Sequence, residues 1–108
     1  MMEVVEYKDE LGHHPFSIWF ASLNVLAALK VRTAIARMEA GNFSNVKAVG
    51  SGVSECKLNF GPGYRIYFAK DGLHLVVLLG GGTKKRQQSD IKKAQLLWKK
   101  YKRRKAQG

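Results

Sequence analysis

The chain has 108 residues, 45% of them hydrophobic, and a formal net charge of +11. This length and composition exclude a disordered chain and predict one folded domain over residues 1–108 with a single core. A single cysteine, Cys56, excludes an internal disulfide, no apolar run reaches the roughly 18 residues of a membrane span, and no signal peptide opens the sequence. We therefore expect a cytoplasmic protein without a membrane partner.

The positive charge is concentrated at one end of the sequence. Residues 1–83 carry a net charge of +1, whereas residues 84–108 carry +10. Such segregation predicts a polyanionic partner, either nucleic acid or the ribosome. The alternative is a basic tail that only increases solubility.

The first half of the chain predicts one strand and two helices. Residues 2–7 form the strand, and Pro15 suits the first turn of a helix over residues 15–23. Asn24 is a candidate N-cap for a second helix that ends at Gly41. Because the connection is so short, we expect the two helices to pack as an antiparallel hairpin. The predicted buried stripe of the second helix consists of Ala27, Val31, Ala34, Ile35 and Met38.

An exposed loop over residues 46–52 is expected to follow, with Lys47 as a candidate phosphate contact. Two strands then meet at a turn formed by Gly61-Pro62-Gly63, because glycine tolerates positive φ and proline fixes its own φ. Alternation places Cys56 on the apolar face. If the hairpin is symmetric about Pro62, two cross-strand pairs share the polar face: Lys57 with Tyr67, and Asn59 with Arg65.

The last two elements are a buried strand and a basic helix. The apolar run over residues 73–79 follows an Asp71-Gly72 turn and predicts a strand that is covered on both faces. A helix over residues 87–103 has Ser89 as a candidate cap and Asp90 near its positive end, and about residues 101–108 are expected to fray. Its apolar stripe, which should dock on the sheet, consists of Ile91, Ala94, Leu97, Trp98 and Tyr101.

This order of strand, two helices, three strands and helix predicts an α+β fold with a mainly antiparallel, twisted sheet and the helical hairpin on one face. The other face would form a shallow basic groove, rimmed by residues 84–86 and the last helix. The polar residues expected to line it are Glu55, Lys57, Asn59, Arg65 and Tyr67.

Several short motifs are spread along most of the chain. They are Gly41-Asn42-Phe43, residues 46–52, Ser54-Glu55, Gly61-Pro62-Gly63-Tyr64-Arg65, Tyr67-Phe68, and Gly81-Gly82-Thr83-Lys84 with Gln87, Asp90 and Ile91. Together they resemble the signature of the Gp49-like group of HigB toxins, addiction module killer proteins of the RelE/ParE superfamily. The sequence departs from that pattern at Thr83, where the group usually has Asp, and at Gly80, where Cys is common.

This resemblance implies a RelE/ParE-like fold of order β-α-α-β-β-β-α. It also implies the toxin of a type II toxin-antitoxin system, which inhibits translation and is silenced by a helix-turn-helix antitoxin of the HigA type. RelE-like toxins are ribosome-dependent endoribonucleases, or mRNA interferases. The implied partners are therefore that antitoxin, mRNA and the ribosome.

The residues themselves favour chemistry without a metal or cofactor, since no ligand set, protease-like triad or Walker spacing stands out. Arginine suits a phosphate, lysine among other cations can act as a general base, and tyrosine can transfer a proton. By resemblance, the catalytic candidates are Arg65, Lys57, Lys84 and Tyr101. Lys57 stands where the group often has Arg. The structural alternatives are an ion pair with Glu55 for Arg65, and a core position for Tyr101.

Three functions remain open from the sequence. The first is an mRNA interferase, the second a ParE-like inhibitor of DNA gyrase, and the third a non-enzymatic protein that binds RNA or ribosomes. The residues expected to bind RNA or the ribosome are Lys47, Lys85, Arg86, Lys92, Lys93, Lys99, Lys100, Arg103 and Arg104.

Overall fold

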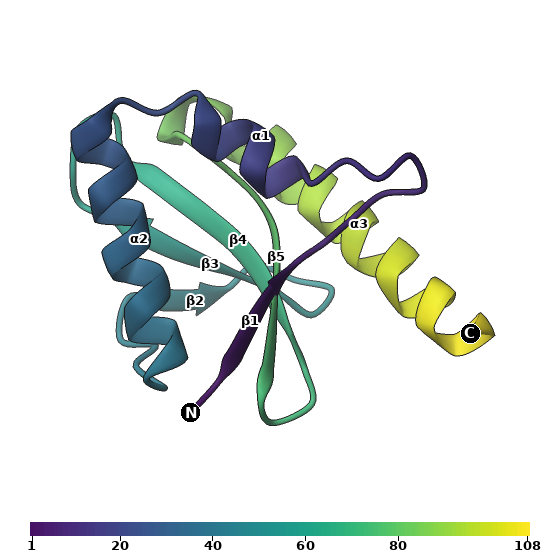
Figure 1. The fold of residues 1–108 in the computed structure, drawn as a ribbon. Coiled ribbons are helices and arrows are strands. Elements are labelled where there is room, and N and C mark those ends of the chain that lie inside the picture. The colour runs from purple at the N-terminus through teal and green to yellow at the C-terminus, as the bar shows by residue number, and fades with distance from the viewer.

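The computed structural model describes residues 1–108 as an α+β fold with one five-stranded mixed sheet and three helices (Figure 1). The elements in chain order are β1 (Glu3–Glu6), α1 (Pro15–Ala21), α2 (Val25–Glu39), β2 (Val46–Ala48), β3 (Val53–Leu58), β4 (Tyr64–Asp71), β5 (Leu75–Gly82), the 3-10 turn η1 (Lys84–Arg86) and α3 (Gln87–Gln107). The strands lie in the order β1-β5-β4-β3-β2. β1 runs parallel to β5 and the other neighbours are antiparallel, so the sheet is mainly antiparallel, as predicted.

Helices cover both faces of the sheet, and the sheet separates the core into two hydrophobic clusters. On one face, Phe16 of α1 and Val31 of α2 pack with Val76 and Leu78. On the other face, α3 packs its buried residues against Val77 and Leu79, and Figure 1 shows α2 and α3 on opposite sides of the sheet. β5 is therefore buried on both sides, which confirms the prediction from its apolar run. None of the helices combines the length and apolarity needed to span a bilayer.

The predicted helical hairpin is wrong, although both helices lie on the same face. α1 contacts β5, whereas α2 contacts β1 and β3, and Figure 1 shows the two helices running in clearly different directions. Both helices pack mainly on the sheet, and they contact each other through Arg32, which lies over the ring of Phe20. The predicted cap is confirmed, because the side chain of Asn24 accepts a hydrogen bond of 2.8 Å from the backbone N–H of Ala27.

The predicted register of the β3–β4 hairpin is wrong by two residues. Lys57 pairs with Arg65, Glu55 pairs with Tyr67, and Asn59 lies outside the strand. The chain reverses through a loop that closes with a hydrogen bond from Gly63 N–H to the carbonyl of Phe60, so the hairpin is not centred on Pro62. Since a shift of two preserves the alternation, Lys57, Arg65 and Tyr67 still share one face.

Three element boundaries also differ from the prediction. Residues Val46–Ala48 form the edge strand β2 instead of a loop, with Lys47 opposite Glu55. Ser89 does not cap α3, because a 3-10 turn precedes the helix and the Ser89 hydroxyl donates to the carbonyl of Arg86. The helix continues to Gln107, so the expected frayed tail is helical.

Candidate functional site

A polar cluster lies where β3 and β4 meet the start of α3. Lys57 and Arg65 face each other across the two strands, and Glu55 and Tyr67 form the next pair on the same face. The start of α3 closes over this corner, because the side-chain amide of Gln87 donates a 2.9 Å hydrogen bond to Oε1 of Glu55. The expected open groove is therefore wrong: α3 buries three of its predicted lining residues and leaves Lys57 and Asn59 exposed.

The centre of the cluster is the carboxylate of Glu55, which is only 1% exposed. Its Oε1 accepts a 3.2 Å hydrogen bond from the hydroxyl of Tyr67 and lies 3.3 Å from Nε of Arg65. Its Oε2 lies 3.7 Å from Nζ of the exposed Lys47. Burial, together with the Glu55 carboxylate, raises the pKa of Tyr67, so this tyrosine remains a hydrogen-bond donor. The carboxylate is thus held by two cations and two neutral donors.

Arg65 is fixed by two different contacts. Its Nη1 donates a 2.6 Å hydrogen bond to the carbonyl of Gly63, and its Nε faces Glu55. Its Nη2 makes no hydrogen bond and is not among the fully enclosed polar atoms. The residue as a whole is 4% exposed. The structure thus contains the Arg65–Glu55 ion pair expected as the structural alternative, and leaves Nη2 as the part of the guanidinium that can meet a ligand.

Lys84 joins this cluster through the turn that follows β5. A Cβ built on Gly63, where φ is +75°, would lie 3.2 Å from Nη1 of Arg65 and 3.5 Å from Cβ of Lys84. The backbone N–H of Lys84 also donates to the carbonyl of Pro62. The hairpin loop therefore lies against both the guanidinium of Arg65 and the Cβ of Lys84 at Gly63. Three of the four catalytic candidates, Arg65, Lys57 and Lys84, are brought together.

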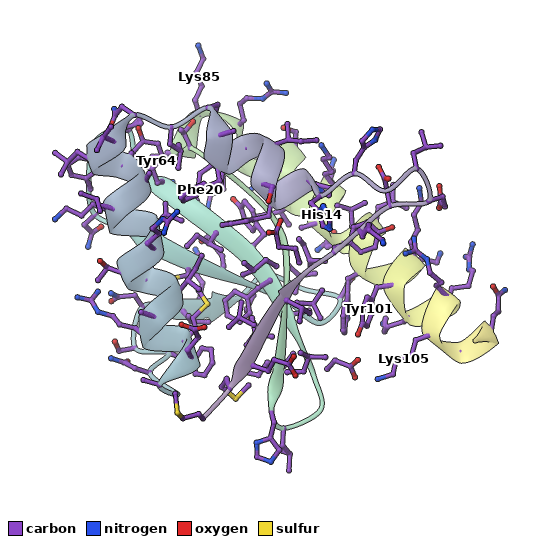
Figure 2. All side chains as sticks on the ribbon, viewed as in Figure 1. His14, Phe20, Tyr64, Lys85, Tyr101 and Lys105 are labelled. Carbon is purple, nitrogen blue, oxygen red and sulfur yellow. The ribbon has the colours of Figure 1, made fainter.

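The fourth candidate, Tyr101, lies elsewhere. It is 14 positions along α3 from Gln87, a distance of roughly 21 Å along the helix axis. Its hydroxyl donates a 2.6 Å hydrogen bond to Oδ2 of Asp71, and its ring stacks on Trp98. Lys105 binds the same carboxylate oxygen, and Figure 2 shows Tyr101 and Lys105 on the same side of the helix. The geometry fits the structural alternative for Tyr101 and does not place it beside Arg65.

The residues expected to bind RNA are all exposed, but they do not form one patch. Lys85 and Arg86 project from η1, where Figure 2 shows Lys85 pointing away from the protein. Arg104 is partly occupied, because it donates to the carbonyl of Lys8 at 2.6 Å and to the hydroxyl of Tyr7 at 3.1 Å. The remaining cations of α3 lie along its exposed surface: Lys92, Lys93, Lys99, Lys100 and Arg103.

A shallow depression lies beside α3, between that helix and the tight turn at Ser51 and Gly52. Lys92 and Lys99 line it together with Lys102, a residue to which the sequence assigned no role in binding. Gln95 fixes this side of the helix, because its amide donates a 2.9 Å hydrogen bond to the carbonyl of Val49. Lys92, Lys99 and Lys102 therefore make this depression positively charged.

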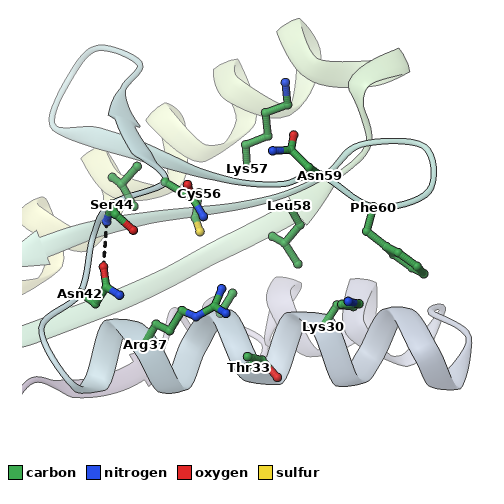
Figure 3. Close-up of a pocket in the computed structure, with 13 residues that line it drawn as sticks. Lys30, Thr33, Arg37, Asn42, Ser44, Cys56, Lys57, Leu58, Asn59 and Phe60 are labelled. Carbon is green, nitrogen blue, oxygen red and sulfur yellow. Dashed lines mark hydrogen bonds between the residues drawn. The ribbon is translucent and has the colours of Figure 1, made fainter.

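A separate groove of about 270 Å³ runs between α2 and β3. Figure 3 shows Cys56 and Leu58 pointing toward α2, whereas Lys57 and Asn59 point away from it. Cys56 therefore lies on the apolar face as predicted, and burial raises the pKa of its thiol. A buried thiol with a raised pKa is a poor nucleophile, and the groove holds no evident reactive group.

Sequence reasoning named two residues of the polar cluster, Gln87 and Lys47, without placing them beside Glu55. Gln87 stands in a motif, but nothing in the sequence shows that the helix begins directly above Glu55. Lys47 was predicted to contact phosphate from a loop, whereas it lies in a strand opposite Glu55. Recognising residues 46–48 as a strand that pairs with β3 would have revealed that Lys47 lies opposite Glu55.

The sequence matches no family model. An uncharacterized protein of Haemophilus influenzae is 41% identical over 83 residues, and the alignment covers 76% of this chain and 84% of that protein. At this identity and coverage, the chain belongs to the same family as the uncharacterized Haemophilus protein.

Proposed function

We propose that the chain is the toxin of a type II toxin-antitoxin system, with a RelE/ParE-like fold, and that it cuts mRNA on translating ribosomes in the cytoplasm. The observation that carries the proposal is the arrangement around Arg65. Its guanidinium is oriented by Gly63 and Glu55, and the exposed Lys57 and Lys84 stand beside it. The motifs that resemble the Gp49-like toxins include Arg65 and Lys84, and Lys57 stands where that group often has Arg.

Cleavage of RNA has three requirements. A ribose 2′-OH must lose its proton as its oxygen attacks phosphorus, the phosphorane must be stabilised, and the departing 5′ oxygen must gain a proton. Nη2 of Arg65 is the atom left to donate to a phosphorane oxygen, because Nη1 already donates to the carbonyl of Gly63 and Nε faces the carboxylate of Glu55. Lys57 and Lys84 are the groups available to take and give the protons. Removing a donor of this kind costs about 100-fold or more in rate.

The exposed cations of η1 and α3 would supply the electrostatic part of RNA and ribosome binding. Contacts between lysine and phosphate release counterions, so binding should weaken steeply as salt increases. The antitoxin partner, proposed to be of the HigA type, would inhibit the toxin by placing acidic side chains over Lys57 and Lys84. This proposal follows from the same cluster, because an acidic segment and a phosphate compete for the same cations.

The Arg65–Glu55 ion pair supports a second candidate function. A guanidinium that is already paired and 4% exposed also fits a purely structural role, in which it holds the hairpin in shape. In that case the exposed lysines would bind RNA or the ribosome without cutting, and the protein would act by occupying its target.

Primer extension on a reporter mRNA in a reconstituted translation reaction separates these candidates. The proteins to compare are the wild type, Arg65→Lys, a Lys57→Ala/Lys84→Ala double variant, and Lys8→Ala as a control lysine outside the cluster. We expect the wild type to produce new 5′ ends on the mRNA only when ribosomes are present. These ends should be lost with Arg65→Lys and with the Lys57→Ala/Lys84→Ala double variant, and should persist with Lys8→Ala. Translation inhibited equally by all four proteins without new ends would favour the binding-only function. Inhibition of gyrase supercoiling would instead favour the ParE-like alternative.

A further inference from the structure

The end of β5 forms one wall of a hollow of about 310 Å³ between α1 and α3. β1 ends at Glu6, which pairs with Leu78, so Gly80, Gly81 and Gly82 continue beyond it without a neighbouring strand on that side. Trp19 of α1 borders the hollow on one side, and α3 borders it on the other. The hollow is therefore an opening at an unpaired strand edge, and it adjoins the cluster around Arg65 through Tyr67.

Two glycines shape this hollow by allowing close approach to the strand. A Cβ on Gly81 would collide with the ring of Trp19, and a Cβ on Gly82 would collide with the carboxylate of Asp90. An aromatic ring and a carboxylate thus lie directly against the backbone of β5. No other residue type at these two positions would leave room for both groups.

Asp90 has no hydrogen-bond or ion-pair partner in the protein, although it is partly buried. Burial raises the pKa of its carboxyl group, and Arg86 and Lys93 act in the opposite direction. Those two cations line the same hollow and make no ion pair within the protein. One acceptor and two cations therefore face the hollow without protein partners, beside the aromatic ring of Trp19.

We propose that this hollow binds a guanine nucleotide unit of the RNA substrate. Guanine presents two adjacent N–H donors, N1–H and N2–H₂, which match the two oxygens of a carboxylate such as Asp90. Its flat ring suits the apolar lining from Trp19 and Ala94, and its phosphate suits Arg86 and Lys93. Adenine would satisfy Asp90 less well, because its N6–H₂ donor lies beside an acceptor at N1 instead of a second donor.

This inference rests on the proposed ribonuclease function, and the structure connects the two sites. Tyr67 lines the hollow, and its hydroxyl donates to the Glu55 carboxylate that pairs with Arg65. The guanine pocket and the catalytic candidates therefore lie on opposite sides of one tyrosine. A nucleotide held in the pocket would place a neighbouring phosphate near Arg65, and the pocket would select the sequence that is cut.

Binding is tested first without any cleavage, by titrating 15N-labelled protein with 5′-GMP and following amide and indole N–H signals. We expect saturable shifts at Gly80–Gly82 and at the indole of Trp19, with binding at least about tenfold weaker for 5′-AMP, 5′-UMP and inorganic phosphate. Asp90→Asn should weaken 5′-GMP binding by about tenfold, and Lys93→Gln should weaken all nucleotides. Glu39→Gln, the same change at an exposed carboxylate outside the hollow, should leave binding unchanged, and all variants should keep dispersed spectra.

Absence of binding, or equal shifts with inorganic phosphate or 5′-AMP, would overturn the guanine site. A cleavage map of a random-sequence mRNA pool then tests its use. Guanine enriched at one position beside the cut, and lost in Asp90→Asn while cutting persists, supports the inference. If no mRNA is cut but 5′-GMP still binds with the expected selectivity, the ribonuclease function fails while the nucleotide site stands.

Discussion

Glu55 and Arg65 lie on adjacent strands and form a buried ion pair, with 3.3 Å between Oε1 and Nε and side-chain exposures of 1% and 4%. Taking two charges out of water is unfavourable unless other donors and acceptors complete their hydrogen bonding. Here Tyr67 and Gln87 donate to Oε1 of Glu55 and the carbonyl of Gly63 accepts from Nη1 of Arg65, whereas Oε2 of Glu55 and Nε of Arg65 have no hydrogen bond. The pair therefore fixes the end of the β3–β4 hairpin, the N-terminus of α3 and the orientation of the guanidinium together.

Removing either partner should be strongly destabilising. Arg65→Ala leaves the Glu55 carboxylate buried and underpaired, and we expect it to lower the free energy of unfolding by about 3–5 kcal/mol in urea titrations. Glu55→Leu combined with Arg65→Met should lose much less than the sum of the two single changes, because no unpaired charge remains. Additive losses would show that the two side chains are not coupled as the geometry indicates.

The basic depression beside α3 predicts how RNA binding depends on salt. Lys99→Gln with Lys102→Gln removes two lysines that line it, so the slope of log affinity against log salt should decrease by about 1.4 for a single-stranded RNA. Filter binding or fluorescence anisotropy at several salt concentrations measures this slope.

Arg104→Gln is the matched comparison for that measurement. Its guanidinium already donates to the Lys8 carbonyl and the Tyr7 hydroxyl, so its loss should lower the melting temperature and leave the salt slope almost unchanged. A slope that changes as much for Arg104→Gln as for the lysine pair would mean that charge at any position on α3 is equivalent.

The contact between Gly81 and Trp19 predicts a large cost for a small substitution. Gly81→Ala should destabilise the protein by about 1–3 kcal/mol, because its methyl group collides with the indole ring. Gly72→Ala has open space around it but a φ of +74°, so its cost should come from backbone conformation and be about 1 kcal/mol.

A double-mutant cycle separates these two causes. Trp19→Leu should relieve most of the additional cost of Gly81→Ala but none of the cost of Gly72→Ala. If Trp19→Leu is equally additive with both glycine changes, α1 does not pack against the end of β5 as described.

The sequence predicted what depends on local periodicity and missed what depends on contacts between distant segments. Alternation placed Cys56 on the apolar face, and the spacing in α3 identified the stripe that docks on the sheet. The arrangement of α1 and α2 was missed because it is set by packing on different strands, α1 on β5 through contacts such as that of Trp19 with Gly81, and α2 on β1 and β3. β2 was missed because a three-residue edge strand leaves almost no periodic signal.

The candidate site was predicted in part, and for a physical reason. Lys57 and Arg65 share a face under either register, because the error was an even number of residues. Tyr101 was grouped with them only through its residue type, and no local pattern shows where along a sheet a long helix lies. The burial of Arg65 was missed for the same reason, since it depends on α3 closing over Glu55 through Gln87.

The contact between Tyr101 and Asp71 predicts a specific loss of stability at high pH. Burial and the Asp71 carboxylate raise the pKa of Tyr101 to about 12, above its ordinary value of about 10. A folded-state pKa that is raised means that the stabilising effect is fully present below about pH 10 and is lost as the pH rises through about 12.

The free energy of unfolding of the wild type should therefore exceed that of Tyr101→Phe by about 1 kcal/mol at neutral pH. Urea titrations of both proteins between pH 8 and about pH 12 should show this difference disappearing across that window. Tyr64→Phe is the matched control, because that tyrosine makes no side-chain hydrogen bond and packs against Trp19 and Phe60. A difference that stays constant to pH 12 would mean that the Tyr101 hydroxyl is not bound to Asp71 in solution.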